Sequence, residues 1–133
     1  MSTYTHIRTS KENKVRVSEL TRKFQFGPEN IIARIALTYS LSKNRKMNLN
    51  NIQNSGGKEY SKNVLFGNYS PYYEALICTH YSLYRTNKDI PKYIKMHIDD
   101  GLELIENELK ENPNLEGFDF LIEKIDEGLK AIV

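Results

Sequence analysis

The sequence predicts a mainly α-helical protein that opens with one short strand. Apolar residues recur at intervals of three and four over most of the chain, whereas alternation typical of a strand is confined to residues 3–9. Length agrees with a single core, since 133 residues with 39% hydrophobic content suit one domain. We expect that domain to span residues 1–110 and a helical C-terminal appendage to follow over residues 111–133.

The first unit of the chain is predicted from the strand and the two helices that follow it. Ser10 supplies a hydroxyl that can cap a helix running from Lys11 to about Phe24. Gly27 is the expected left-handed end of this helix, and Pro28 opens the next one in its first turn. The order of elements is therefore strand, helix, glycine turn and helix.

The second helix, residues 28–43, is unusually apolar. Ile31, Ile32, Ile35, Ala36 and Tyr39 fill one arc, and Ala33, Leu37 and Leu41 fill much of the rest. A helix that is apolar on nearly all sides must be buried from several directions, and we expect a second copy of the chain to supply the cover. Residues 3–43 thus resemble a ribbon-helix-helix unit, in which two chains pair their strands into an antiparallel ribbon.

The remaining elements are predicted from the spacing of apolar residues and from the positions of glycine and proline. Residues 44–54 read as a polar loop, and Gly56–Gly67 as a turn with an extended piece that lacks the spacing of a phosphate-binding loop. Three further helices are expected, over residues 71–85, 91–109 and 118–132. The tyrosines of the first of these are expected to serve core or interface packing rather than base stacking.

The charges divide unevenly between the two halves of the chain. Residues 1–66 carry 12 Lys and Arg against 4 Asp and Glu, a charge of +8, whereas residues 67–133 carry 7 against 13, a charge of −6. A basic half in a protein of net charge +2 favours a polyanionic partner such as DNA or RNA. We expect the acidic half to contact partner proteins.

The basic residues concentrate in and beside the first helix. At 100° per residue, Lys11, Lys14 and Arg22 lie within an arc of about 80°. Another flank holds two more cations, and one precedes the helix. The predicted phosphate-contacting set is Arg8, Lys11, Lys14, Arg16, Arg22 and Lys23.

Catalytic and targeting signals are weak. His6, His80 and His97 show no metal-ligand spacing, and His97 reads as a boundary residue. Asp99 and Asp100 are adjacent, hence on different helix faces, and read as solvated charges. Cys78 cannot form an internal disulfide, which is typical of a cytoplasmic protein. We therefore expect no enzyme, metal or cofactor, and neither a membrane span nor a secretion signal.

Three segments in order resemble the DNA sulfur-modification protein DndE family. They are HIRTSKENKVRVSELTRKFQFGPENIIARIALTYSLS, GGKEYSKNVLFGNYSPYYEALI and HIDDGLELI, which cover most of residues 6–109. The resemblance implies a non-catalytic, ribbon-helix-helix-related homotetramer that binds DNA, with a preference for nicked duplex. It also implies reductase-like and ATPase partners in the machinery that replaces a phosphate oxygen of DNA with sulfur.

The resemblance assigns DNA contact to lysines of the N-terminal helical region. The matching positions here are Lys11, Lys14, Arg22 and Lys23, with Arg16 beside them; Arg in place of Lys keeps the charge but changes the geometry. We expect contacts to the DNA backbone that are blind to sequence.

Two alternatives stay open. One is a sequence-specific ribbon-helix-helix regulator that reads the groove with Thr5 and Ile7, or with His6 and Arg8. The other is an assembly scaffold for the sulfur-transfer complex, whose basic face contacts proteins.

Overall fold

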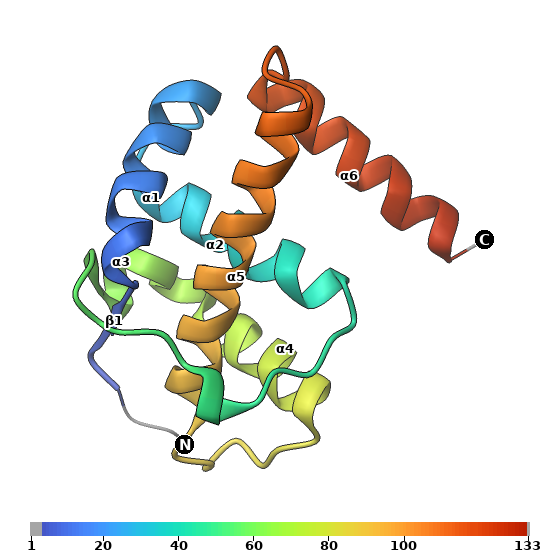
Figure 1. Cartoon of the computed structure of the whole chain (residues 1–133). Coiled ribbons are helices and arrows are strands. Elements are labelled where there is room, and N and C mark those ends of the chain that lie inside the picture. The colour runs from blue at the N-terminus through green and yellow to red at the C-terminus, as the bar shows by residue number, and fades with distance from the viewer. Residues whose placement is uncertain (1–3, 133) are drawn as a thin grey trace.

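A computed structural model describes residues 4–132 and shows a mainly helical protein with one two-stranded sheet (Figure 1). This confirms the predicted class. In chain order the elements are β1 (His6–Arg8), α1 (Lys11–Phe24), α2 (Glu29–Ser42), the 3-10 turn η1 (Leu49–Asn51), β2 (Glu59–Ser61), α3 (Lys62–Phe66), the 3-10 turn η2 (Gly67–Tyr69), α4 (Ser70–Tyr81), α5 (Ile90–Glu111) and α6 (Gly117–Ala131).

Helix α1 has the predicted bounds, but the residue that caps its C-terminal end differs from the one expected. The Ser10 hydroxyl accepts a hydrogen bond from the backbone N–H of Asn13, which satisfies one free donor of the first turn. At the other end Gln25, not Gly27, takes the left-handed conformation, with φ of 58°, and its N–H donates to Thr21. Gly27, with φ of 102°, belongs to the turn that leads into α2.

Helix α2 lies at the centre of the molecule and is covered by its own chain. It packs against α1, α3 and above all α5, which crosses it in Figure 1. The close crossing requires Gly101, because a Cβ there would overlap the carbonyl oxygen of Ala36. Ile32, Ala33 and Leu37 are fully buried without a second copy. The chain therefore covers much of α2 itself, whereas Ile31, Ile35 and Leu41 stay partly exposed, and cover by a second copy stays a prediction.

The strand also finds its partner within the chain. β1 pairs antiparallel with β2, with Ile7 opposite Tyr60, and both of these side chains point into the core. The two-chain ribbon that we expected from the sequence needs β1 to pair with a second copy. The intrachain pairing replaces it on this edge of β1, so the ribbon-helix-helix arrangement is not seen.

The C-terminal helices follow the predicted pattern with shifted ends. α4 stops at Tyr81 rather than at residue 85, because Ser82 adopts a left-handed conformation. The backbone N–H of Ser82 then donates to the carbonyl oxygen of Cys78 and closes the helix. α6 is rooted in the core by Leu115 and Phe120 and then runs away from the body of the molecule (Figure 1). The predicted appendage thus shares its first turn with the main core.

Candidate nucleic-acid interface

A buried carboxylate fixes the start of α1 on α5. Asp99 is 1% exposed, and its Oδ1 accepts from the backbone N–H of Ser10 at 2.9 Å and from Asn13 Nδ2 at 2.7 Å. Its Oδ2 accepts from Lys95 Nζ at 2.6 Å. These donors compensate the loss of hydration that a buried carboxylate suffers. Asp99 is therefore a structural anchor, and its interpretation as a solvated charge is wrong.

The segment after η1 holds the same helix end from the other side. Asn54 Oδ1 accepts from the backbone N–H of Lys11 at 2.9 Å, and the N–H of Gly57 donates to Thr9 at 3.0 Å. A Cβ at Gly57 would overlap the carbonyl of Ser10, so this close approach requires glycine. The Gly56–Gly67 segment therefore positions α1 and supplies β2.

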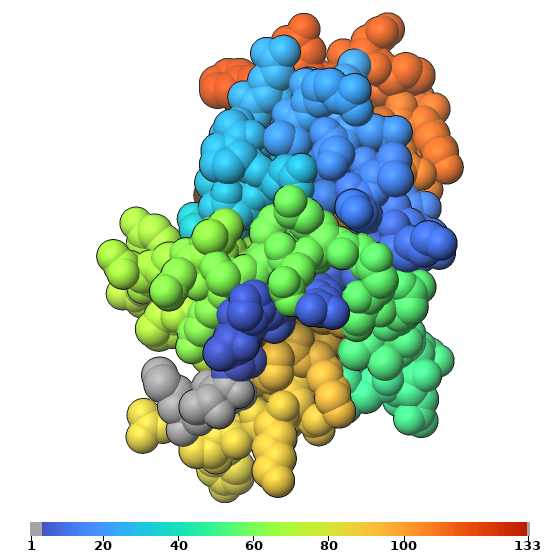
Figure 2. Space-filling model, turned by 90° about the vertical axis from the view of Figure 1, so that its left-hand side faces the viewer, coloured from blue at the N-terminus to red at the C-terminus, as the bar shows by residue number. Residues whose placement is uncertain are grey.

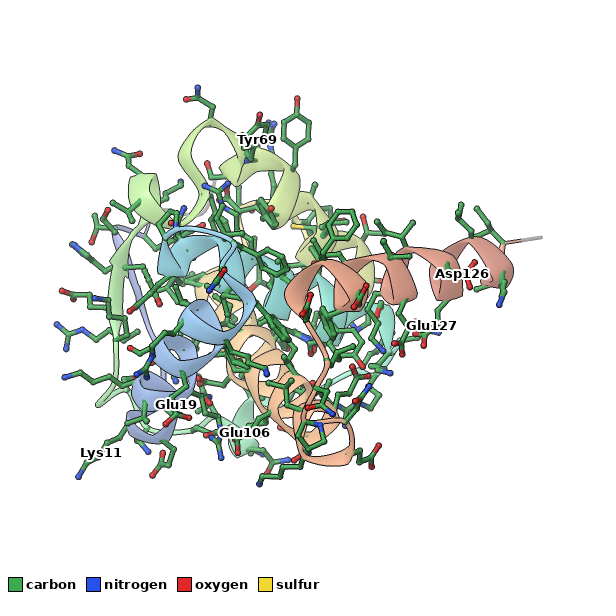
Figure 3. The ribbon with its side chains drawn as sticks, turned by 90° about the horizontal axis from the view of Figure 1, so that it is seen from above. Lys11, Glu19, Tyr69, Glu106, Asp126 and Glu127 are labelled. Atoms are coloured by element: carbon green, nitrogen blue, oxygen red, sulfur yellow. The ribbon has the colours of Figure 1, made fainter. Side chains whose placement is uncertain are left out.

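Three of the predicted cations share the outer face of this anchored helix. Lys11, Lys14 and Arg22 are exposed, and none forms an ion pair within residues 4–132. On the face shown in Figure 2, α1 (blue) lies beside the segment that holds β2 and α3 (green). In Figure 3, Lys11 extends from α1 into solvent at an edge where several neighbouring side chains end in nitrogen. We call these three residues the α1 stripe.

The other three predicted cations are engaged elsewhere. Arg16 Nε donates to Glu106 at 2.7 Å, and its NH1 lies 3.6 Å from Glu103, so it ties α1 to α5. Lys23 Nζ donates to the carbonyl of Pro113 at 3.0 Å. Arg8 bonds Glu59 at 2.8 Å across the sheet and holds the pKa of that carboxyl below its usual range. The six predicted residues therefore divide into three that are unpaired on the outer face of α1 and three whose side chains bond other parts of the chain.

One cation near the α1 stripe, Lys58, is not among the six predicted from the sequence. Lys58 pairs with Thr9 at the end of the sheet, and its side chain is 45% exposed. Its Nζ lies 3.8 Å from Glu29, the first residue of α2, whose carboxylate also accepts from Ser18 at 3.2 Å. The signal was the Gly56–Gly57–Lys58 run, which lacks the spacing of a phosphate-binding loop but places a cation directly after two glycines. The start of α2 is occupied by Glu29, which disfavours a phosphate there.

A second buried polar network centres on His97. Its Nδ1 lies 2.7 Å from Ser40 Oγ and its Nε2 lies 2.6 Å from the Tyr81 hydroxyl. Ser40 also donates to Asp100, which accepts from Arg45. Burial, helped by the nearby charge of His80, lowers the pKa of His97 to about 4. His97 is 1% exposed, so it is a core residue and not the boundary residue expected.

The same network bears on catalysis. Ser40 and His97 are hydrogen-bonded but almost fully buried, so substrate has no access to this pair. Burial raises the pKa of the half-buried Cys78 thiol, which disfavours the reactive thiolate. Within residues 4–132, no three His, Cys, Asp or Glu side chains are grouped as metal ligands would be. None of the described helices combines the length and apolarity that a membrane span requires.

The fold and the site together define a small, mainly α-helical protein that presents one anchored, cationic helix face. Residues 6–113 match the family model described as DNA sulphur modification protein DndE. The chain therefore belongs to the DndE family, and so to the proteins of DNA phosphorothioation. No curated protein sequence matches it.

Solved structures agree with this assignment. A crystal structure of DndE from Escherichia coli B7A, involved in DNA phosphorothioation modification, superposes with a TM-score of 0.62 at 18% identity. A mutant DndE involved in DNA phosphorothioation superposes with a TM-score of 0.65 at 19% identity. Each comparison covers 79% of this chain and 99% of the other. At such identities the likeness shows a shared fold.

Proposed function

We propose that this chain is a non-catalytic, DNA-binding subunit of the phosphorothioation machinery, which holds duplex DNA through its phosphates. The observation that carries the proposal is the α1 stripe. Lys11, Lys14 and Arg22 are exposed and free of ion pairs in the described part of the chain, on a helix whose start is anchored from two sides. Family membership supplies the chemical context, because the DndE family acts in DNA sulfur modification.

The length of the stripe suits a DNA backbone. From Lys11 to Arg22 the helix rises about 16 Å, at 1.5 Å per residue. Duplex DNA carries about one phosphate per 1.7 Å of axis, so a stripe of this length can lie along several phosphates. Each copy offers these three unpaired cations, and Lys58, whose Nζ lies 3.8 Å from Glu29, adds a partly compensated charge. Such contacts position a protein on DNA without reading its bases.

The sheet supports contacts that are blind to sequence. In the alternative regulator, β1 would enter a groove and its side chains would touch base edges. Here Ile7 is buried and the guanidinium of Arg8 is bonded to Glu59. These two side chains would have to leave their partners before reading a base. We therefore favour backbone contacts, with a preference for nicked duplex because a nick lowers the cost of bending.

Partner subunits complete the proposal. Residues 67–133 carry a net negative charge, which disfavours contact with DNA, and we propose that this half contacts the reductase-like and ATPase subunits of the machinery. The homotetramer that the family resemblance implied stays a prediction. We expect the subunit to act in the cytoplasm, together with its DNA.

The test compares two triple variants in which the charge changes equally. Lys11→Glu, Lys14→Glu and Arg22→Glu reverse the stripe, whereas Lys88→Glu, Lys110→Glu and Lys130→Glu reverse three exposed cations elsewhere. Affinity for intact and nicked duplex of one sequence is measured over a salt series. We expect the stripe variant to lose binding while it keeps its circular dichroism spectrum, and the control variant to bind.

Two outcomes would contradict the proposal. Equal binding by both triple variants would remove the α1 stripe from the interface. No affinity of the unaltered protein for DNA at any salt concentration would favour the assembly scaffold, and protection of one site in footprinting would favour the regulator.

A further inference from the structure

Two tyrosine rings are exposed where η2 meets α4. Tyr69 is 58% exposed and Tyr72 is 69% exposed, and Figure 3 shows Tyr69 at the outer edge of the molecule. Tyr73 and Tyr81 of α4 pack against the core instead. Core packing therefore accounts for Tyr73 and Tyr81 and leaves Tyr69 and Tyr72, which we call the tyrosine pair, facing solvent.

The backbone around the tyrosine pair is well supported. Pro71, between the two tyrosines, lies in the first turn of α4, where its ring fixes its own φ. Phe66 stacks on Tyr73 with ring centroids 4.5 Å apart, which ties α4 to the end of α3. The ring centroids of Tyr69 and Tyr72 are 6.3 Å apart and the planes are tilted by 44°, so the rings do not stack on each other. Each exposed ring thus offers a face to another planar group.

A cation lies beside the same turn. Arg34 is half-buried, and its Nε donates to the carbonyl oxygen of Leu65 at 2.5 Å. A terminal nitrogen of its guanidinium lies beside Gly67, 3.9 Å from where a Cβ would stand. Gly67 begins η2 and Tyr69 ends it, about 4 Å further along the turn. Arg34 forms no ion pair with any side chain of residues 4–132, so its remaining N–H groups can bind an anion beside the tyrosine pair.

The segment around the tyrosine pair is almost free of negative charge. Between residues 60 and 88 the only acidic residue is Glu74, which is 7% exposed and lies 3.8 Å from Lys62. Glu59, which precedes this segment, is paired with Arg8. The negative charge of residues 67–133 therefore comes almost entirely from residue 89 onward. A polyanion that approaches the tyrosine pair meets no exposed carboxylate of this segment.

The tyrosine pair lies on the side of the molecule that carries the α1 stripe. Figure 2 shows the start of α4 (yellow-green) on the same face as α1 (blue), with the segment of β2 and α3 (green) between them. One DNA molecule can therefore reach both places from the same side.

We propose that the tyrosine pair and Arg34 form a binding site for unpaired bases of DNA. The two rings stack on bases, and the guanidinium binds a phosphate of the same strand. Within an intact duplex the faces of a base are covered by its neighbours in the stack. Only a base in a gap, a flap or an opened duplex can lie on a tyrosine ring. The inference rests on the proposed DNA contact and adds the form of DNA that the subunit prefers.

The experiment compares intact duplex with the same duplex carrying a gap of three unpaired nucleotides, one of them the fluorescent base 2-aminopurine. Stacking on a ring quenches 2-aminopurine, so fluorescence reports the base and the titration reports affinity. We expect the unaltered chain to bind the gapped duplex at least about tenfold more tightly than the intact duplex, and to quench the probe.

The variants separate ring stacking from other contacts. Tyr69→Ala with Tyr72→Ala should abolish the preference for gapped duplex and the quenching, while affinity for intact duplex stays unchanged. Tyr69→Phe with Tyr72→Phe keeps both rings and should behave like the unaltered chain. The control is Tyr84→Ala, because Tyr84 is 87% exposed but lies beyond the end of α4. All three tyrosines are exposed, and circular dichroism checks the fold of each variant.

Arg34 is tested through salt dependence. Arg34→Gln should reduce the slope of log affinity against log salt by about 1 on gapped duplex and leave the slope on intact duplex unchanged. An unchanged slope on gapped duplex would remove Arg34 from the site.

Three outcomes overturn the stacking site. They are an unaltered chain that binds both duplexes equally, an alanine pair variant that keeps the preference and the quenching, and an alanine pair variant that binds both duplexes equally weakly. If instead the alanine pair variant loses a partner subunit and keeps its preference for gapped duplex, the surface is a protein contact and the proposal is wrong.

Failure of this inference is distinguishable from failure of the proposed function. Intact duplex bound through the α1 stripe, with no preference for the gap, leaves the proposed function standing and removes the stacking site. Unchanged binding after reversal of the α1 stripe contradicts the proposed function, and the quenching of 2-aminopurine still reports on the tyrosine pair.

Discussion

The backbone N–H of Ser10 donates to the carboxylate of Asp99 at 2.9 Å, and this bond joins the cap of α1 to the middle of α5 across 89 residues of chain. Ser10 thus has two roles, since its hydroxyl caps α1 while its amide is held by α5. The orientation of the α1 stripe depends on this joint.

Loss of the carboxylate should strongly destabilise the fold. Asp99→Ala leaves the ammonium of Lys95 and the amide of Ser10 buried without their acceptor. We expect a loss of about 3 to 5 kcal/mol in the free energy of unfolding, measured by urea denaturation. Asp126→Ala is the control, since its pair with Lys130 is exposed and should be worth no more than about 0.5 kcal/mol. Similar losses for the two variants would deny Asp99 its anchoring role.

Arg16 and Lys14 should separate stability from DNA affinity. Arg16→Ala removes the bond to Glu106 and should cost about 1.5 to 3 kcal/mol of unfolding free energy, with little effect on the salt dependence of DNA binding. Lys14→Ala should change stability by less than about 0.5 kcal/mol and reduce the slope of log affinity against log salt by about 1. The opposite pattern would move the interface to the other flank of α1.

Replacing two helical glycines, Gly101 and Gly128, with alanine should change the stability of the protein in opposite directions. At Gly101 the added Cβ meets the carbonyl of Ala36, so α2 and α5 must separate, and we expect a loss above about 2 kcal/mol. At Gly128 nothing lies within 4 Å of the added Cβ. Gly128→Ala should therefore stabilise the protein by up to about 1 kcal/mol through helix propensity. Thermal unfolding of both variants is the measurement, and a neutral Gly101→Ala would contradict the tight crossing.

Acid should weaken the fold through His97. Its pKa falls from 6.5 to about 4 on folding, so the unfolded chain binds a proton at a pH where the folded chain does not. The contribution of His97 is full above pH 6.5 and is lost as pH falls towards 4, by about 1.4 kcal/mol per unit.

The measurement for His97 is unfolding free energy against pH, compared with two variants. His97→Gln should flatten the dependence in this window, and His6→Gln, at an exposed position, should leave it unchanged. An identical profile for His97→Gln would mean that other groups cause the acid sensitivity.

Local signals predicted the helices well and their surroundings poorly. The bounds of α1 agree with the prediction because the Ser10 cap and the apolar spacing lie within the segment itself. Asp99 and His97 were misjudged because both sit on α5, where polar side chains read as solvent-facing. Their partners, at Ser10 and Ser40, come from distant segments that periodicity does not reveal.

The sequence by itself determined that Lys11, Lys14 and Arg22 share one side of a helix, because 100° per residue is a local property. Tertiary structure alone decided which cations are free. Arg16 and Lys23 are engaged because α5 and Pro113, some 90 residues away, lie beside their flank of α1. The cover of α2 by its own chain was decided likewise, since only tertiary packing brings α5 across this helix.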